Sequence, residues 1–561
     1  MKTVIVGGVA GGASAAARLR RLDERSEIVL LERGEYISFA NCGLPYYVGG
    51  EITEKSALTL QTPESFYNRF RIDVRVLSEV VSIDRAGKTV TIHDLKEDRQ
   101  YTETYDKLIL STGAEPLVPP IEGAKSAIVF TLRNIPDAYA IRDKVVSLGQ
   151  GKKAVIVGGG YIGVEMAENL LHAGLDVTIV EMADHLIAPL DADMAADVHH
   201  YAEEKGLKLM LGSAVTGIVE RDGSMTVTTS TGDMAADVVI LSVGVRPESR
   251  LAKEAGLPCN AKGGILVDDH MRTEDENIYA VGDAVEITEF VTGDKAMVPL
   301  AGPANKQGRI AADNICGLHS RYTGTQGSAV LKLFDMTIAT TGLNERTAKA
   351  KGIDCDKVFL YSANHAGYYP GSTMMSMKVI FETLSGRILG AQIVGFDGVD
   401  KRCDVLATAI RFNATGRDLA QLELCYAPPF GSAKDPVNMA GFVIENIEKG
   451  LIHQFHWHDV AALPRDGSVQ LLDVRTPAEA ARGMIDGFTN IPLDELRQHL
   501  KELDRTKPIY VHCHSGLRSY LACRILTGEG FHCYNLAGGY RLYQSVTGEG
   551  KPPVSAMPCK K

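Results

Sequence analysis

The sequence lacks paired cysteines: its 10 cysteines are scattered over 561 residues, with no Cys-x-x-Cys pair and no zinc-finger spacing. This pattern argues against a disulfide framework and a structural metal, so we expect no metal site. The chain also lacks an apolar run of membrane length, and its apolar start at residues 4–6 is too short for a signal peptide. We therefore expect a cytoplasmic protein with no membrane-spanning segment.

Positive charge is also in deficit. The 59 lysines and arginines are outnumbered by 70 aspartates and glutamates, which gives a formal net charge of -11. The chain has no basic footprint for nucleic acid, and we expect no such partner. Hydrophobic residues make up 45% of the chain and charged residues 23%, which is ordinary for a globular protein with an ample core. At about 100–200 residues per domain, the length predicts three or four domains.

Two glycine-rich turns each link an apolar, strand-like run to a helix-like segment. In the second turn, Gly158, Gly160 and Gly163 stand at the full spacing of a dinucleotide-binding fingerprint. The first turn is less complete, because Val9 occupies the place of the middle glycine. Such turns present backbone N–H groups and a helix N-terminus to a pyrophosphate. The positions that we expect to serve this purpose in the first turn are Gly7, Gly8, Ala10, Gly11 and Gly12.

A glutamate ends the strand that follows each turn. Glu32 ends the run 27–32, and Glu181 follows the run 177–180. A carboxylate at this point binds a ribose hydroxyl of a dinucleotide. No arginine stands beside Glu181 to accept a 2′-phosphate, because Met182 and Ala183 come next. We therefore expect NADH rather than NADPH at the second turn.

A single cysteine, Cys42, lies in the stretch Ser-Phe-Ala-Asn-Cys-Gly at 38–43, just after the strand that ends in Glu32. No second cysteine lies within five residues on either side. Gly43 permits close approach of the backbone to a ligand. A redox-active Cys42 must therefore work alone, with a sulfur of the substrate or a distant thiol as its partner.

The two nested nucleotide folds, together with the Gly-Asp pair at 282–283, resemble the pyridine nucleotide-disulfide oxidoreductases over residues 1 to about 445. The resemblance implies FAD at the first fold, NAD at the second and a dimerisation domain after them. Asp283 is placed to take hydroxyls of a ribityl chain. The further positions that the resemblance implies for FAD are Arg33, Asn41, Val80, Ala114 and Ala301.

Two tyrosine-containing motifs narrow the resemblance to the coenzyme A-disulfide reductase branch. Tyr368 lies in His-Ala-Gly-Tyr-Tyr-Pro-Gly, and Tyr426 lies in Cys-Tyr-Ala-Pro-Pro-Phe-Gly. In that branch, two tyrosines from the neighbouring subunit approach the active cysteine, and these two match best. The resemblance therefore implies a homodimer with Tyr368 and Tyr426 at the catalytic site. The alternative is that both motifs are structural turns.

The first helix carries candidates for binding the phosphates of coenzyme A. Arg18 and Arg21 lie one helical turn apart on one face, and solvated surface charges are the alternative for both. Arg71 and Lys434 are further candidates for the same role. The other positions expected to contact substrate are Ser14, Ser38 and Asn41.

The last part of the chain resembles a rhodanese domain. Cys513 follows a strand and precedes a helix in the stretch Cys-His-Ser-Gly-Leu-Arg-Ser. Loop N–H groups and the helix N-terminus favour a thiolate or persulfide there, and Arg518 adds positive charge. We expect this loop to be open to donors and His512 and His514 to be solvated. An inactive rhodanese-like binding fold is the alternative, and a resolving role for Cys533 or Cys559 stays open.

Together these features predict an α/β protein with two nested Rossmann-like dinucleotide-binding domains, an α+β dimerisation domain and a C-terminal α/β rhodanese domain. The expected FAD-binding domain comprises residues 1–115 and 246–320, and the NAD-binding domain residues 116–245. The dimerisation domain is expected at 321–447, a polar linker at 448–456 and the rhodanese domain at 457–555.

The chain most resembles fusions of a coenzyme A-disulfide reductase with a rhodanese. The resemblance implies NADH-dependent reduction of coenzyme A persulfide, coenzyme A disulfide or polysulfide through Cys42, with Cys513 carrying sulfane sulfur. One alternative is an NADH oxidase or peroxidase with a Cys42 sulfenate, although Val9-Ala10 replaces the histidine that such enzymes carry in the first turn. The other is a redox-sensing sulfur carrier that docks a partner. The physiological sulfur substrate and the direction of sulfur flow at Cys513 stay open.

Overall fold

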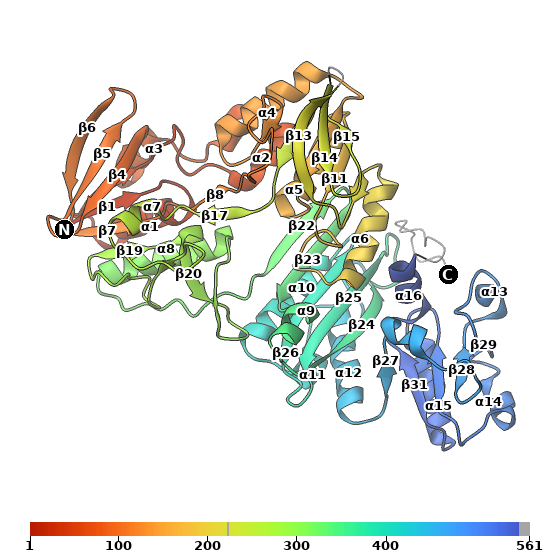
Figure 1. The fold of residues 1–561 in the computed structure, drawn as a ribbon. Helices are drawn as coiled ribbons and strands as arrows, with labels where there is room; N and C mark the ends of the chain where they lie inside the picture. Colours follow the sequence, from red (N-terminus) through yellow and green to blue (C-terminus); the bar gives the residue numbers. More distant parts are fainter. Residues whose placement is uncertain (222–223, 549–561) are drawn as a thin grey trace. The chain divides into compact units, whose positions relative to one another are not determined.

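A computed structural model gives the structure of residues 1–221 and 224–548 (Figure 1). The chain forms two compact units. The first comprises Met1–Ala183 and Gly206–Gly327, and the second comprises Asp184–Lys205 and the chain from Ser328 onward. Cys559 and the end of the expected rhodanese domain lie outside the described residues. No helix within the described ranges is long and apolar enough to cross a membrane.

The first unit contains a five-stranded parallel sheet whose central strand starts the chain. Val4 pairs with Val29 on one side and with Leu108 on the other, and all three are fully buried. Parallel strands are apolar on both faces because helices cover both sides of such a sheet. The strands in spatial order are β19 (Ile278–Ala280), β7 (Lys107–Leu110), β1 (Lys2–Val6), β2 (Glu27–Leu31) and β3 (Asp73–Arg75).

Two helices of this fold, α1 (Ala10–Leu22) and α8 (Ala301–Ile315), pack in close contact. A Cβ on Gly308 would meet the carbonyl oxygen of Gly11 at 2.2 Å, so this crossing requires glycine. The other elements around the sheet are α3 (Pro63–Phe70), β4 (Ser78–Asp84), β5 (Thr89–Asp94), β6 (Arg99–Thr104), α7 (Arg250–Glu254), β18 (Ile265–Leu266), β20 (Val285–Thr288) and β21 (Lys295–Ala296).

A second five-stranded parallel sheet repeats the arrangement in the same unit. Its strands in order are β12 (Lys208–Met210), β11 (Asp176–Val180), β10 (Lys153–Val157), β16 (Val238–Leu241) and β9 (Val129–Phe130). Helices α4 (Ile135–Leu148) and α5 (Tyr161–His172) accompany it, with the antiparallel strands β13 (Val215–Arg221), β14 (Ser224–Thr229) and β15 (Met234–Ala235). Strands β8 (Ala114–Pro116) and β17 (Val245–Pro247) pair where the chain passes from the first nucleotide fold to the second and where it returns.

The second unit begins with an antiparallel sheet. Its strands in order are β22 (Ala329–Leu333), β23 (Met336–Gly342), β26 (Ile388–Gly395), β25 (Met374–Glu382) and β24 (Cys355–Ala363). The helices of this part are α9 (Glu345–Ala350), α10 (Val399–Arg411), α11 (Gly416–Gln421) and α12 (Pro436–Glu448). This is the α+β domain expected after the nucleotide folds.

Residues 184–205, which the sequence places in the NAD-binding domain, belong to this second unit. They contain α6 (Ala192–Glu204). The reason is a buried charge cluster around Lys378 of β25, whose ammonium lies 3.0 Å from Asp191, 2.9 Å from Asp193 and 2.8 Å from Glu345. A fully buried lysine is tolerated only with such partners, so the segment is held against β25.

The last domain is a parallel sheet of β27 (Gln454–Phe455), β31 (Cys533–Leu536), β30 (Ile509–His512), β28 (Gln470–Asp473) and β29 (Thr489–Asn490). Its helices are α13 (Pro477–Ala480), α14 (Leu496–His499), α15 (Leu517–Gly528) and α16 (Gly539–Thr547). The expected linker 448–456 therefore already contains a strand, because residues 454–455 pair with β31.

This last domain is fixed to the antiparallel domain by buried contacts. The Ser545 hydroxyl of α16 donates to Asp197 of α6 at 2.6 Å, and the Ser376 hydroxyl of β25 donates to the same carboxylate at 2.8 Å. The Gln454 amide donates to the Lys357 carbonyl of β24 at 2.8 Å. Since buried hydrogen bonds are costly to leave unmade, these contacts oppose free swinging of the domain.

Candidate functional site

The first glycine turn has the geometry of a dinucleotide cradle. Gly7 has φ +101°, and a Cβ there would meet the Ser111 carbonyl oxygen at 2.1 Å. A Cβ on Gly12 would lie 1.9 Å from the Gly7 carbonyl oxygen, so the first turn of α1 lies directly against the end of β1. The Glu32 carboxylate accepts hydrogen bonds from the N–H groups of Gly8 and Gly34, each at 2.8 Å.

The second turn repeats this geometry almost atom for atom. Gly158 has φ +105°, and a Cβ on Gly163 would meet the Gly158 carbonyl oxygen at 2.0 Å. The Glu181 carboxylate accepts from Gly159 N–H at 2.6 Å and from Ala183 N–H at 2.7 Å. A Cβ on Gly160 would have no heavy atom within 4 Å, so the chain itself does not need glycine at the middle position. This is why Val9 leaves the first turn intact.

Both turns therefore fit a dinucleotide, with the pyrophosphate at the helix N-terminus and the ribose at the glutamate. Asp283 adds a second acidic group to the first fold, in η3 (Gly282–Ala284) shortly after β19. Burial raises the pKa of the Asp283 carboxyl, and the charge of Arg133 opposes this rise. The other positions implied for FAD also lie in the first unit. Ala10, Asn41 and Ala301 are the first residues of α1, η1 and α8. Val80 and Ala114 are buried, and the Arg33 guanidinium lies 3.6 Å from the Glu248 carboxylate.

Cys42 lies in a short 3-10 helix, η1 (Asn41–Gly43), that continues into α2 (Leu44–Gly49). Gly43 has right-handed helical angles, so Cys42 and Tyr46 are one helical turn apart on one face. The Cys42 side chain is exposed. The Tyr46 hydroxyl donates to the Glu165 carboxylate of α5 at 3.3 Å. Sequence reasoning missed the Tyr46–Glu165 pair, although the spacing of Cys42 and Tyr46 was a usable signal.

The charges around Cys42 disfavour its thiolate. Desolvation raises the pKa of Cys42, and the carboxylates of Glu165 and Asp283 raise it further. Desolvation also raises the pKa of Glu165 to about 7; Glu168 adds to the rise and the Tyr46 hydrogen bond opposes it. Glu165 is therefore protonated or charged depending on small pH changes around neutrality, and its charge acts directly on the Cys42 sulfur.

We expect Glu165→Gln to lower the pKa of Cys42. Above about pH 7 the Glu165 carboxylate is charged and repels the thiolate, and glutamine removes this repulsion. Alkylation of Cys42 by iodoacetamide, followed by mass spectrometry as a function of pH, measures the change. Glu254→Gln, an exposed residue that pairs with Arg250, is the matched control. An alkylation midpoint that is unchanged or higher in Glu165→Gln would contradict the assignment.

The two tyrosines predicted from their motifs come together in the second unit. The hydroxyls of Tyr368 and Tyr426 are 3.2 Å apart, and both side chains are exposed. The hydrogen bond between the two hydroxyls raises the pKa of Tyr368. A phenol with a raised pKa is a weak acid, so this pair is suited to donating hydrogen bonds rather than to giving up a proton.

The candidate residues for coenzyme A phosphates have varied surroundings. Arg18 already pairs with Asp313 at 2.7 Å and is largely buried, and the Ser14 hydroxyl bonds to Asn305. Arg21 and Arg71 are exposed in the first unit, and Lys434 is exposed in the second. Ser38 has φ +43°, the left-handed region. The phosphate-binding roles of these residues stay predictions.

The Cys513 loop forms a cradle for a sulfur anion. The Sγ atom of Cys513 accepts hydrogen bonds from the Gly516 N–H at 3.1 Å and from the Ser519 hydroxyl at 3.2 Å. The expectation of an open loop is wrong in one respect, because the Cys513 side chain is only 1% exposed. Donors that converge on one sulfur stabilise a thiolate or a persulfide, so the loop suits sulfur transfer from slender donors.

Arg518 is not a free cation at this site. Its guanidinium makes a bidentate pair with Glu479, at 2.7 Å for both contacts. Glu479 also caps α13 through a Thr476 capping box, a Thr-Pro-Ala-Glu signal that the sequence displays. The charge of Arg518 is therefore largely neutralised, and sequence reasoning missed the partner.

The expectation of a solvated His512 is wrong, because this side chain is fully buried. Its ring packs edge-on against Phe488 and is stacked with Tyr540. Burial lowers the pKa of His512 to about 4, so the ring is neutral. Cys533 is buried as well, and its thiol donates a hydrogen bond to the Cys523 carbonyl at 3.3 Å. A resolving role for Cys533 stays a prediction.

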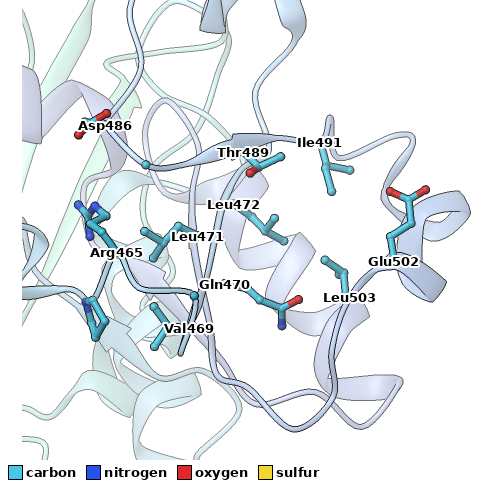
Figure 2. A pocket seen from close by; sticks show the side chains of 13 residues that line it. Arg465, Val469, Gln470, Leu471, Leu472, Asp486, Thr489, Ile491, Glu502 and Leu503 are labelled. Carbon is cyan, nitrogen blue, oxygen red and sulfur yellow. The ribbon is translucent and has the colours of Figure 1, made fainter.

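One cavity of about 500 Å³ lies along β28 and β29 (Figure 2). Figure 2 shows Arg465 and Asp486 at one end of its lining and Glu502 at the other. None of its lining residues belongs to the loop 513–519. The cavity is therefore separate from the Cys513 cradle.

Family models match these three regions separately. The model of the pyridine nucleotide-disulphide oxidoreductases matches residues 1–308, and the dimerisation domain of the same family matches residues 328–436. The chain belongs to this family. A rhodanese-like domain matches residues 456–545. The predicted family and the predicted fold class are therefore confirmed.

Individual relatives extend the family likeness. A Bacillus anthracis protein designated CoADR-RHD, in reduced form, has 49% identity and a TM-score of 0.95 over 98% of both chains. An NAD-dependent persulfide reductase from A. fulgidus has 39% identity and a TM-score of 0.90, covering 97% of this chain and 100% of that one. These two likenesses include the rhodanese region of this chain.

Shorter relatives match the oxidoreductase part. A coenzyme A disulfide reductase from Staphylococcus epidermidis is 36% identical over 442 residues, which is 79% of this chain and 99% of that protein. A protein named NADH oxidase from Methanocaldococcus jannaschii is 36% identical over 441 residues, 78% of this chain and 98% of its own length. Two different activities are therefore named among relatives of this size.

Proposed function

We propose that this protein is an NADH-dependent FAD enzyme that reduces coenzyme A persulfide or coenzyme A disulfide through Cys42, with Cys513 carrying sulfane sulfur. The observation that carries the proposal is the pairing, in one chain, of a solitary exposed Cys42 in the dinucleotide-binding unit with the hydrogen-bonded Cys513 cradle. All described cysteines are free, which fits a reducing cytoplasm.

The first glycine turn, Glu32 and Asp283 would hold FAD, which when bound would supply two-electron transfer between NADH and sulfur. The residues of the chain do the rest. The Cys42 thiolate attacks the outer sulfur of a persulfide, or one sulfur of a disulfide, and the departing thiolate takes up a proton. Desolvation and the charges of Glu165 and Asp283 make Cys42 harder to ionise, and Tyr46 donates a hydrogen bond to Glu165. Tyr368 and Tyr426 donate hydrogen bonds to the departing thiolate, and in a homodimer they come from the partner subunit.

NADH should be preferred over NADPH by at least about tenfold in kcat/KM, because the Glu181 carboxylate repels a 2′-phosphate and binds a 2′-hydroxyl. The geometric support is the double backbone clamp that fixes this carboxylate at the turn. Steady-state kinetics with both nucleotides measure the preference. Glu181→Ala should narrow it, and Glu220→Ala, exposed on β13, should leave it unchanged. Equal or better use of NADPH by the wild type would refute the assignment.

Replacing either Tyr368 or Tyr426 by phenylalanine should lower kcat about tenfold, the scale for losing a hydrogen bond to a charged group. The KM for NADH should not change, since the pair acts on sulfur. Tyr369→Phe is the matched control, because its exposed ring lies beside this pair in the chain. If both single variants and the double variant kept wild-type kcat and KM, the tyrosines would be structural.

Assays of NADH oxidation with sulfur substrates in the absence of oxygen, and with added peroxide or oxygen, separate the proposal from its strongest alternative. With coenzyme A persulfide and NADH, we expect one sulfide and one coenzyme A thiol for each NADH oxidised. The Methanocaldococcus relative named NADH oxidase favours the alternative, oxygen or peroxide reduction through a Cys42 sulfenate. Faster NADH oxidation with peroxide or oxygen than with any sulfur substrate would support that alternative and overturn the proposal.

A further inference from the structure

The N-terminus of α16 lies directly on the Cys513 loop. The Tyr540 N–H donates to the Cys513 carbonyl and the Arg541 N–H to the His514 carbonyl, both at 2.8 Å. Gly539 has φ +62°, and a Cβ there would lie 2.7 Å from the Cys513 carbonyl oxygen. The backbone of Arg541 is therefore fixed to the loop that holds the reactive sulfur.

Two other arginines near this loop are neutralised by carboxylates. Arg475 is buried and pairs with Asp473 at 2.6 Å, and Arg518 pairs with Glu479 at 2.7 Å. Arg541 differs, because no carboxylate among the described residues lies within ion-pair distance of its half-buried side chain. Of these three arginines, Arg541 is the one whose charge is available to bind an anionic ligand.

The side chain of Arg541 is held from the neighbouring domain. Its guanidinium lies over the ring of Tyr361 in β24, 4.3 Å from the ring centre. Arg541 and Ser545 are one turn apart on α16, and Ser545 is anchored on Asp197. Cation–π stacking fixes the plane of a guanidinium and leaves its N–H groups free to bind a planar or tetrahedral anion.

We propose that Arg541 binds the anionic group of the sulfane donor that loads Cys513, and that Tyr361 is the positioning residue that holds it. This inference rests on the proposed role of Cys513. The anion is the sulfonate of thiosulfate or a phosphate of coenzyme A persulfide. With thiosulfate, the Cys513 thiolate takes the outer sulfur, the S–S bond of the donor breaks and sulfite leaves with its electron pair. With coenzyme A persulfide, the same attack releases the coenzyme A thiolate, and the transferred sulfur keeps its proton.

The charge of Arg541 acts on His514 in the Cys513 loop. Desolvation lowers the pKa of His514 most, and the positive charge of Arg541 is the next largest cause. The charges of Arg475 and Arg518 also lower this pKa, whereas the carboxylate of Glu479 raises it. These charged groups come from α13 (Glu479), the loop after β28 (Arg475), α15 (Arg518) and α16 (Arg541). Removing the Arg541 charge should therefore raise the pKa of His514, which NMR titration of the ring measures independently of turnover.

The kinetic test uses Arg541→Gln and Arg541→Lys in the full-length enzyme, with persulfide formation on Cys513 followed by mass spectrometry. For Arg541→Gln we expect about a tenfold higher half-saturating concentration for the anionic donor and an unchanged maximal rate. Arg541→Lys should recover part of this loss. A neutral dialkyl trisulfide, whose attack by Cys513 releases an alkanethiolate and leaves an alkyl trisulfide adduct of known mass, should modify wild type and variant equally. Arg505→Gln, an exposed arginine of the same domain that pairs with Glu529, is the control.

Comparing the two donors identifies the anion that Arg541 binds, and the Tyr361 variants test whether the ring positions Arg541. A loss with both thiosulfate and coenzyme A persulfide assigns the residue to a shared anion, and a loss with one of them identifies that donor. Tyr361→Phe keeps the ring and should behave like wild type, whereas Tyr361→Ala should weaken anionic donors only. Equal loss for neutral and anionic donors in Arg541→Gln would mean a structural role and overturn the inference. If no donor loads Cys513 in the wild type, the proposed role of Cys513 itself fails.

Discussion

Replacement of Cys42 by serine should abolish reduction of every disulfide and persulfide substrate, with kcat/KM falling by more than about a thousandfold, the scale for losing a covalent nucleophile. The reason is the solitary position of Cys42, since no second cysteine lies within five residues to take its place. Serine is nearly isosteric but is not ionised at neutral pH, so the attack on sulfur stops. Steady-state assays with coenzyme A persulfide and coenzyme A disulfide measure the effect.

The control for this variant is its first half-reaction. Stopped-flow bleaching of the flavin absorbance by NADH should proceed at the wild-type rate in Cys42→Ser, because the substitution leaves the proposed NADH site at Gly158–Gly163 unchanged. Cys259→Ser, which alters a cysteine of the same unit with no motif around it, should keep full activity. Wild-type-like turnover of coenzyme A persulfide by Cys42→Ser would rule out Cys42 as the nucleophile.

Replacement of Cys513 by serine should remove sulfur transfer from thiosulfate or polysulfide by more than about a thousandfold. Reduction of coenzyme A persulfide should stay within about threefold of wild type, since independent sites contribute separately. The division follows from the structure of the second unit, where Ser545 and Gln454 fix the rhodanese domain to its neighbour. Sulfur on Cys513 must then travel on a slender carrier, and the pantetheine arm of coenzyme A is one.

The burial of Cys513 does not change this expectation, but it restricts the sulfur donors that can reach the thiol. Only donors with a slim terminal sulfur reach a side chain that is 1% exposed, so a large folded donor should load Cys513 slowly. Cys523→Ser, a buried cysteine of the same domain, is the control for general damage to the fold. If Cys513→Ser lost coenzyme A persulfide reduction as completely as Cys42→Ser, the two cysteines would form one obligatory relay.

The dinucleotide-binding folds are predictable from sequence because a tight turn has few solutions. Gly7 and Gly158 adopt positive φ, and Gly12 and Gly163 accept a backbone contact that no side chain would tolerate. Each requirement leaves a glycine at a fixed spacing. Val9 lowers the formal match without altering the geometry, because the middle position is open in the chain itself.

Long-range pairing is what the sequence leaves hidden. The membership of residues 184–205 in the second unit depends on Asp191 and Asp193 meeting Lys378 in a buried cluster. Nothing in a local pattern reveals a pairing between residues almost 190 positions apart. The partner of Arg518 is hidden for the same reason, since Glu479 looks only like a helix cap until the loop and α13 meet.

The Cys42 surroundings show the same division. The cysteine, its neighbours and the dinucleotide turn are visible as motifs. One of the two carboxylates that raise its pKa, Glu165, is on α5, and a Cβ on Gly49 of α2 would lie 2.2 Å from Asn169 of that helix. This close packing brings Tyr46 to Glu165 and depends on the fold rather than on spacing.

The central claim is that Cys42 alone forms the covalent link to the substrate, and mass spectrometry of the enzyme oxidised with coenzyme A disulfide tests it most directly. We expect a single coenzyme A attached to Cys42 through a mixed disulfide, released as free thiol when NADH is added without oxygen. Cys42→Ser should carry no adduct, and Cys513→Ser should carry the same adduct as wild type. An unmodified Cys42, or a Cys42 found only as sulfenic acid, would contradict the account.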